Sequence, residues 1–248
     1  MKISDSNFLE YLGAEEHNLL ASIVNFKSDF DLFYNLDQIY REPLIRLEIP
    51  PSKATIPQLF LFVHFHLYFS VSCILRSHLS ECLGSMRKAI DASLSAYQII
   101  LEPSSAQAYE NRNPMFQHIK SHIQNEIKKD SSKYPLAHQL VNIHDLCSEF
   151  GSHADVSSFF HRLELRPDAN GKKELRVHYF QFPKKKPEYQ FYFIATLQGF
   201  YLMFRIFKVF FDQNLKIIDI HWEQLIETLG KKLDEQRKLY KSKMDTGT

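Results

Sequence analysis

Glycine is scarce in this chain, which contains only seven glycines among 248 residues. A β-sandwich or a β-barrel has many tight turns, and such turns favour glycine because it adopts positive φ without steric cost. The glycines are also scattered, which excludes a phosphate-binding loop and a dinucleotide-binding fingerprint. No Gly-x-Ser-x-Gly sequence occurs, so the nucleophile elbow of an α/β-hydrolase is excluded as well.

Cysteine and net charge are also low. The three cysteines, Cys73, Cys82 and Cys147, form no Cys-x-x-Cys pair, which argues against a disulfide framework and against a thiolate zinc site. Thirty basic residues against 29 acidic ones give a formal net charge of +1, so no global field attracts nucleic acid or an anionic membrane. The N-terminal residues lack the uninterrupted apolar stretch of a signal peptide. We therefore expect a cytoplasmic protein without a metal or a cofactor.

Two segments are apolar enough to resemble membrane spans, Leu59–Leu75 and Phe191–Phe211. The first contains two histidines and runs directly into Arg76, and the second carries Arg205 and Lys208. A charged side chain at the centre of a bilayer is costly. We therefore predict that both segments are buried helices of a soluble bundle, with no membrane as a partner.

The pattern of apolar residues predicts a mainly α protein, a long-helix bundle with a small β-hairpin insertion. We expect one helical domain over residues 1–248, with a bundle core over 14–155, the hairpin over 158–182 and a C-terminal helical pair over 188–242. Between Gln58 and Leu101 no proline interrupts the helical pattern. This stretch predicts one very long helix, or two nearly collinear helices with a bend near Gly84.

The stretch Arg76–Leu101 is the most informative part of the sequence. One side of this helix is apolar at the spacing of a buried face. The opposite side consists of Arg76, Ser80, Gly84, Arg87, Asp91 and Ser95. Arg87 and Asp91 are four residues apart and can pair on the helix surface. Two interpretations stay open. In the first, this side of the helix is a solvated face. In the second, the small residues permit a close-packed interface or a cleft, and Arg76, Arg87 and Asp91 are binding or interface residues.

A second notable stretch is His144–Asp155, which reads as a helix that Gly151 ends. The turn after it carries Ser152 and His153, which we take as a candidate binding residue and a candidate catalytic residue. A histidine there can cap the last carbonyls of the helix. Alternatively, His153 acts as an acid, a base or an anion ligand facing Arg87.

The residues Arg-Lys-Ala-Ile-Asp-Ala-Ser-Leu-Ser-Ala-Tyr, followed later by Ser-Glu-Phe-Gly-Ser-His, resemble the HEPN-type helical domains of bacteria, above all branches linked to abortive infection. The resemblance covers Ile56–Asp155. It implies a metal-independent endoribonuclease with an Arg-polar-x(4–6)-His motif at a dimer interface, and Arg112 to His118 fits that pattern. Arg112 would then stabilise the phosphorane charge, His118 would move a proton, and the RNA 2′-hydroxyl would be the nucleophile. Pro114 departs from the continuous helix of the family.

Two functions therefore stay open. One is an RNA-binding or RNA-cleaving protein in bacterial defence or stress, with Arg112, His118 and His153 as catalytic candidates. The other is a non-catalytic helical interaction or adaptor module. We expect a homodimer in both cases, and the aromatic helix around Tyr189–Phe211 is either core or the seam of that dimer. No metal site is predicted, because His118 and His122 lack a third ligand at a recognisable spacing.

Overall fold

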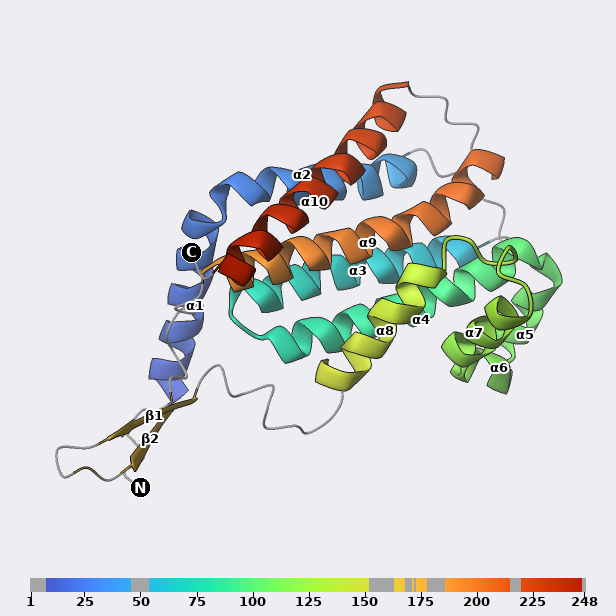
Figure 1. Cartoon of the computed structure of the whole chain (residues 1–248). Helices are drawn as coiled ribbons and strands as arrows, with labels where there is room; N and C mark the ends of the chain where they lie inside the picture. The colour runs from blue at the N-terminus through green and yellow to red at the C-terminus, as the bar shows by residue number, and fades with distance from the viewer. Residues whose placement is uncertain are drawn as a thin grey trace.

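The computed structural model of the chain describes residues 8–45, 54–151, 163–167, 171, 173–177, 186–214 and 220–246. Its helices are α1 (Phe8–Asn25), α2 (Lys27–Ile45), α3 (Thr55–Leu75), α4 (Leu79–Leu101), the 3₁₀ turn η2 (Pro103–Ser105), α5 (Ala106–Glu110), α6 (Pro114–Gln117), α7 (Ile119–Lys129), α8 (His138–Gly151), α9 (Lys186–Asn214) and α10 (Ile220–Thr246). They form a bundle (Figure 1), so the mainly α class is confirmed. The strands β1 (Leu163–Pro167) and β2 (Lys173–Val177) pair antiparallel. The rest of the region predicted as a hairpin lies outside the described residues.

The chain reverses direction between α3 and α4, which corrects the prediction of one long or nearly collinear element. Ser77 has a φ of 66° and lies in the turn between the two helices. Antiparallel contacts then link the helices, because His66 Nδ1 lies 2.8 Å from Ser85 Oγ and Ser70 Oγ donates to the Cys82 carbonyl. The predicted bend near Gly84 is wrong. The turn contains no glycine or proline, which are the residues that usually mark a chain reversal in a sequence. Because positive φ is rare for serine, the sequence contains no signal of this turn.

Helix α9 is the central element of the bundle. It packs against α2, α3, α4, α8 and α10 (Figure 1). Its fully buried aromatic residues are Phe193, Phe200, Phe204, Phe207 and Phe211. Of the two roles proposed for the aromatic helix, core is therefore the one observed. By length and composition alone, α3 and residues 187–214 could each cross a membrane, and 61% of each such window is buried inside the bundle.

A buried carboxyl group links α2 to α9 and α10. Asp29 is 0% exposed and accepts hydrogen bonds from Tyr240 OH at 2.8 Å, Gln236 Nε2 at 3.0 Å and Gln190 Nε2 at 3.5 Å. Burial raises the pKa of Asp29, and the three hydrogen bonds oppose that shift. Three helices thus meet at one acceptor group, which fixes their relative positions.

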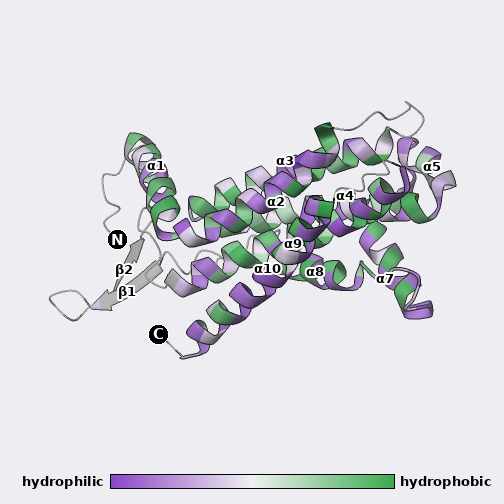
Figure 2. Ribbon diagram, turned by 90° about the horizontal axis from the view of Figure 1, so that it is seen from above, coloured by the Kyte–Doolittle hydropathy of each residue, from purple (hydrophilic) through white to green (hydrophobic). Residues whose placement is uncertain are grey.

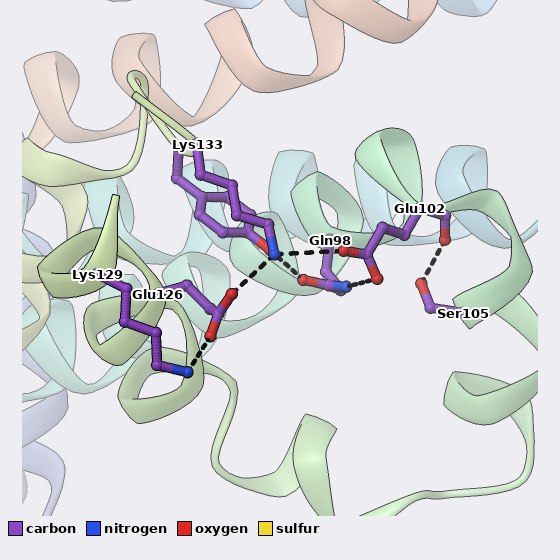
Figure 3. Close-up of polar contacts among 7 residues, drawn as sticks. Gln98, Glu102, Ser105, Glu126, Lys129 and Lys133 are labelled. Carbon is purple, nitrogen blue, oxygen red and sulfur yellow. Dashed lines mark hydrogen bonds and ion pairs between the residues drawn. The ribbon is translucent and has the colours of Figure 1, made fainter. Parts of the chain in front are cut away.

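An exposed polar cluster joins the C-terminal end of α4 to α7 (Figure 3). Lys133 Nζ lies 2.8 Å from Glu126 Oε2 and 3.4 Å from Glu102 Oε1, and Gln98 Nε2 donates to Glu102 Oε2 at 2.9 Å. Hydrogen bonds from Lys129 and Lys133 lower the pKa of Glu126 to about 2. Every charge in this cluster has a partner, and exposed ion pairs contribute little to stability. We therefore regard the cluster as a structural contact and not as a site.

Candidate functional site

The predicted Arg112–His118 motif does not lie within one helix. Arg112 is in the turn between α5 and α6, where its φ is 55°. Asn113 then caps α6, because its Oδ1 accepts from the Met115 backbone N–H at 2.9 Å, and Pro114 is the first helical residue. His118 follows in the turn before α7. Both side chains are exposed, and within the described residues no hydrogen bond or ion pair joins them.

The structure brings Asp91 of α4 to a histidine of α8. His144 Nε2 lies 3.1 Å from Asp91 Oδ1, which replaces the predicted pair between Arg87 and Asp91. Ser148 Oγ donates to the His144 carbonyl at 2.8 Å and lies 3.4 Å from its Nδ1. Burial raises the pKa of the Cys147 thiol to about 12, and the charge of Arg87 opposes that shift. Asp91 and His144 therefore form a polar cluster between α4 and α8, and Arg87 of α4 lies near enough to Cys147 for its charge to act on the thiol.

The polar side of α4 is buried only towards its C-terminal end, and Arg76, Ser80, Gly84, Arg87 and Asp91 are half-exposed. Ala92 and Ser95 are only 8% and 4% exposed, and α8 packs against α4. Close packing is therefore observed around Ala92 and Ser95, while the roles predicted for Arg87 and Asp91 stay predictions. Arg76 lies apart from the cluster and donates from Nη1 to the Ser72 carbonyl at 3.2 Å, at the C-terminal end of α3. Ser152 and His153 lie outside the described residues.

His144 is a site residue that the sequence interpretation missed. The sequence feature that could have identified His144 is its spacing, three positions before Cys147 and four before Ser148. This spacing places the three residues on one side of α8. A histidine whose ring nitrogen faces a carboxylate is held in orientation for proton transfer, and a nearby Arg can stabilise a negative charge. The ring is nevertheless only 7% exposed, so access to it is narrow. Among the described residues, no group of three or more His, Cys, Asp or Glu is placed to hold a metal ion.

A second feature is an exposed apolar face on α3, which we call the α3 face. Its residues are Leu61, Phe62, Phe65, Tyr68 and Phe69, with exposed fractions of 50%, 44%, 61%, 44% and 47%. The only other exposed residue of α3 is Gln58, and the helix contains no Asp, Glu, Lys or Arg. Helix α3 lies along one edge of the bundle, with α10 at the opposite edge (Figure 2). A contiguous apolar surface of this kind marks a site of interaction.

The polar groups of α3 are engaged along its flanks. On the side of α2, Tyr68 OH donates to Asp37 Oδ1 at 2.5 Å and His64 Nε2 lies 2.9 Å from the same oxygen. Burial and Asp37 raise the pKa of Tyr68 to about 12, so its hydroxyl stays a donor at neutral pH. On the side of α4, His66 faces Ser85. The α3 face, which lies between these two flanks, therefore consists of aliphatic and aromatic side chains.

Comparison of the chain with protein-family models, with curated proteins and with solved structures finds no match. The polar cluster between α4 and α8 and the α3 face are therefore interpreted from the sequence and structure of this chain alone.

Proposed function

We propose that this protein is a non-catalytic helical interaction module that binds another protein chain through the α3 face. The observation that carries the proposal is the composition of that face, with five large apolar side chains exposed on one helix and no charge among them. Exposed helix surfaces normally carry charged residues, and burying these five side chains against a partner is favourable at about 25 cal/mol per Å² of apolar surface.

The α4–α8 cluster supports an interaction protein as well. The His144 ring is buried, and its Nε2 faces Asp91. Arg87 lies close enough to Cys147 to act on its pKa. These contacts hold α8 on α4, which is what a rigid scaffold for a binding face requires.

A photo-crosslinking amino acid at Phe65 tests this function in the cells that produce the protein. We expect a specific cross-linked product from position 65 and none from Leu239, a control residue on α10 with 46% exposure. The captured chain, once identified and purified, must bind the parent protein and not the Phe65→Lys variant. Equal cross-linking at positions 65 and 239, or binding that Phe65→Lys leaves unchanged, contradicts the proposal.

A second candidate function is an RNA-binding or metal-independent RNA-cleaving protein in bacterial defence or stress. It is favoured by the contact between a histidine and a carboxylate, His144 and Asp91, on helices that contribute to the HEPN-like sequence. In this function His144 or the more exposed His118 moves the proton and Arg87 or Arg112 stabilises the phosphorane. The histidine of the resembling Ser-Glu-Phe-Gly-Ser-His sequence, His153, remains a further candidate.

An RNA-cleavage assay without added metal tests the second function. If the parent protein cleaves RNA, one of His118→Ala, His144→Ala and His153→Ala should lower the rate by about 100-fold to 10,000-fold, the usual contribution of a general acid or base. The unfolding midpoint of each variant is the control, because His144 also joins α8 to α4. Absence of cleavage by the parent over a broad set of RNAs excludes RNA cleavage, and absence of binding to the same RNAs excludes the RNA-binding function as well.

A further inference from the structure

We infer that the α3 face binds a second copy of this chain, with the two α3 helices antiparallel and Phe65 close to the two-fold axis. This inference rests on the proposed interaction function and adds the identity of the partner. It is carried by the charge, the register and the area of the face.

The charge of the face favours a copy of itself as the partner. A surface with charged residues selects a partner with opposite charges, whereas the α3 face has none to offer. In a two-fold dimer the same patch lies on both subunits, so the patch must be complementary to itself. An uncharged apolar face meets this condition, because no charge is buried without a partner when two copies meet.

The register of α3 is symmetric about Phe65. In an antiparallel pair centred on that residue, Leu61 lies opposite Phe69 and Phe62 lies opposite Tyr68 of the other copy. The polar residues Gln58 and Ser72, each seven positions from Phe65, lie opposite each other at the two ends. The face consists of two rows, at positions 61, 65 and 68 and at positions 62, 65 and 69, and each row has one step of three and one of four. Reversal of the helix about Phe65 exchanges the two rows. Antiparallel helices also place the ends of their dipoles next to ends of opposite sign.

The area of the face matches the apolar part of a dimer interface of ordinary size. With about half of each side chain exposed, the five residues present on the order of 500 Å² of surface per copy, since a large aromatic side chain has roughly 150–250 Å² to bury. A stable interface buries about 800 Å² per partner, and part of that area is a polar rim. Gln58 and Ser72, together with neighbouring residues of α2 such as Arg41, can provide that rim.

Sedimentation equilibrium over a range of protein concentrations tests the inference. We expect the parent protein to be a dimer and the Phe65→Lys variant to have a dissociation constant at least about 100-fold higher, because two lysines would then face each other at the centre of the interface. The matched control, Leu239→Lys on α10, should leave the dissociation constant unchanged. Unfolding midpoints establish that all three proteins are folded, since Phe65 and Leu239 are both exposed.

A charge-swap variant sharpens the test. Phe65→Glu alone should also be a monomer, and mixing it with Phe65→Lys should restore a dimer that contains one copy of each. A parent protein that stays monomeric at all concentrations overturns the inference, while a cross-linked chain of another kind would still support the interaction function. A dimer that survives Phe65→Lys, or binding to lipid vesicles that Phe65→Lys abolishes, also overturns it, because the dimer would then use another surface or the face would bind a membrane.

Discussion

Replacing Asp29 with alanine is expected to lower the free energy of unfolding by about 2–4 kcal/mol, because donors that now share one carboxylate are left without an acceptor. Tyr240 is 3% exposed and Gln190 is 9% exposed, so water cannot readily replace the lost acceptor. The measurement is urea unfolding at neutral pH. Asp31→Ala, at an exposed position of the same helix, is the control and should change the free energy of unfolding by less than about 0.5 kcal/mol. An equal effect of the two substitutions contradicts the structural role of Asp29.

The Asp29→Asn variant adds a pH dependence to this prediction. Because burial raises the folded-state pKa of Asp29 above the ordinary value of 3.8, the folded protein holds this proton when the unfolded chain has lost it. The stabilisation from the protonated carboxyl is present below pH 3.8 and is lost as the pH rises through the raised pKa. The stability of the parent relative to Asp29→Asn should therefore fall between pH 3.8 and neutral pH. A rise over the same interval contradicts the direction of the shift.

Replacing Tyr40 with alanine is expected to cost about 3–5 kcal/mol of stability, the usual effect of removing a large aromatic side chain from a core. Tyr40 is 0% exposed, stacks on Phe60 at 5.1 Å between ring centroids, and donates from OH to the Phe200 carbonyl at 2.8 Å. Tyr40→Phe removes only this hydrogen bond and should cost about 1 kcal/mol. Urea unfolding of both variants measures the difference.

The control for Tyr40 is Tyr34, which is 62% exposed on the same helix. Tyr34→Ala should lower the free energy of unfolding by less than about 1 kcal/mol. If Tyr40→Ala were as mild as Tyr34→Ala, the packing of α2 on α3 and α9 around this ring would be incorrect.

The helical class and the burial of α9 follow from the sequence, but the exposure of α3 does not. The sequences of α3 and α9 are apolar on every side, and this pattern predicts that a helix is buried. The pattern does not indicate whether the same chain or another molecule covers the helix. Helix α9 is covered by five other helices of the same chain, whereas one side of α3 is covered by none of the described residues. The reversal at Ser77 was also beyond prediction, because a serine with positive φ has no distinctive local sequence.

The candidate site was predictable only in part. Of the small residues of α4, Ala92 and Ser95 are buried, whereas Ser80 and Gly84 are half-exposed, so small size alone did not identify which part of the helix is packed. The partner of Asp91 was not predictable from spacing, because His144 is more than 50 positions away and meets it only through the packing of α8. Pro114 gave a correct warning that Arg112 and His118 do not share a continuous helix.

Oxidative cross-linking of a Phe65→Cys variant tests most directly whether the α3 face meets its own copy. Cys73, Cys82 and Cys147 are free and buried, so a cross-link through the native thiols should be slow. We expect Phe65→Cys to form a disulfide-linked dimer at protein concentrations where the parent is dimeric, and Leu239→Cys to stay unlinked. Equal rates for the two variants, or a Phe65→Cys protein that stays unlinked while dimeric, would contradict an interface built on α3.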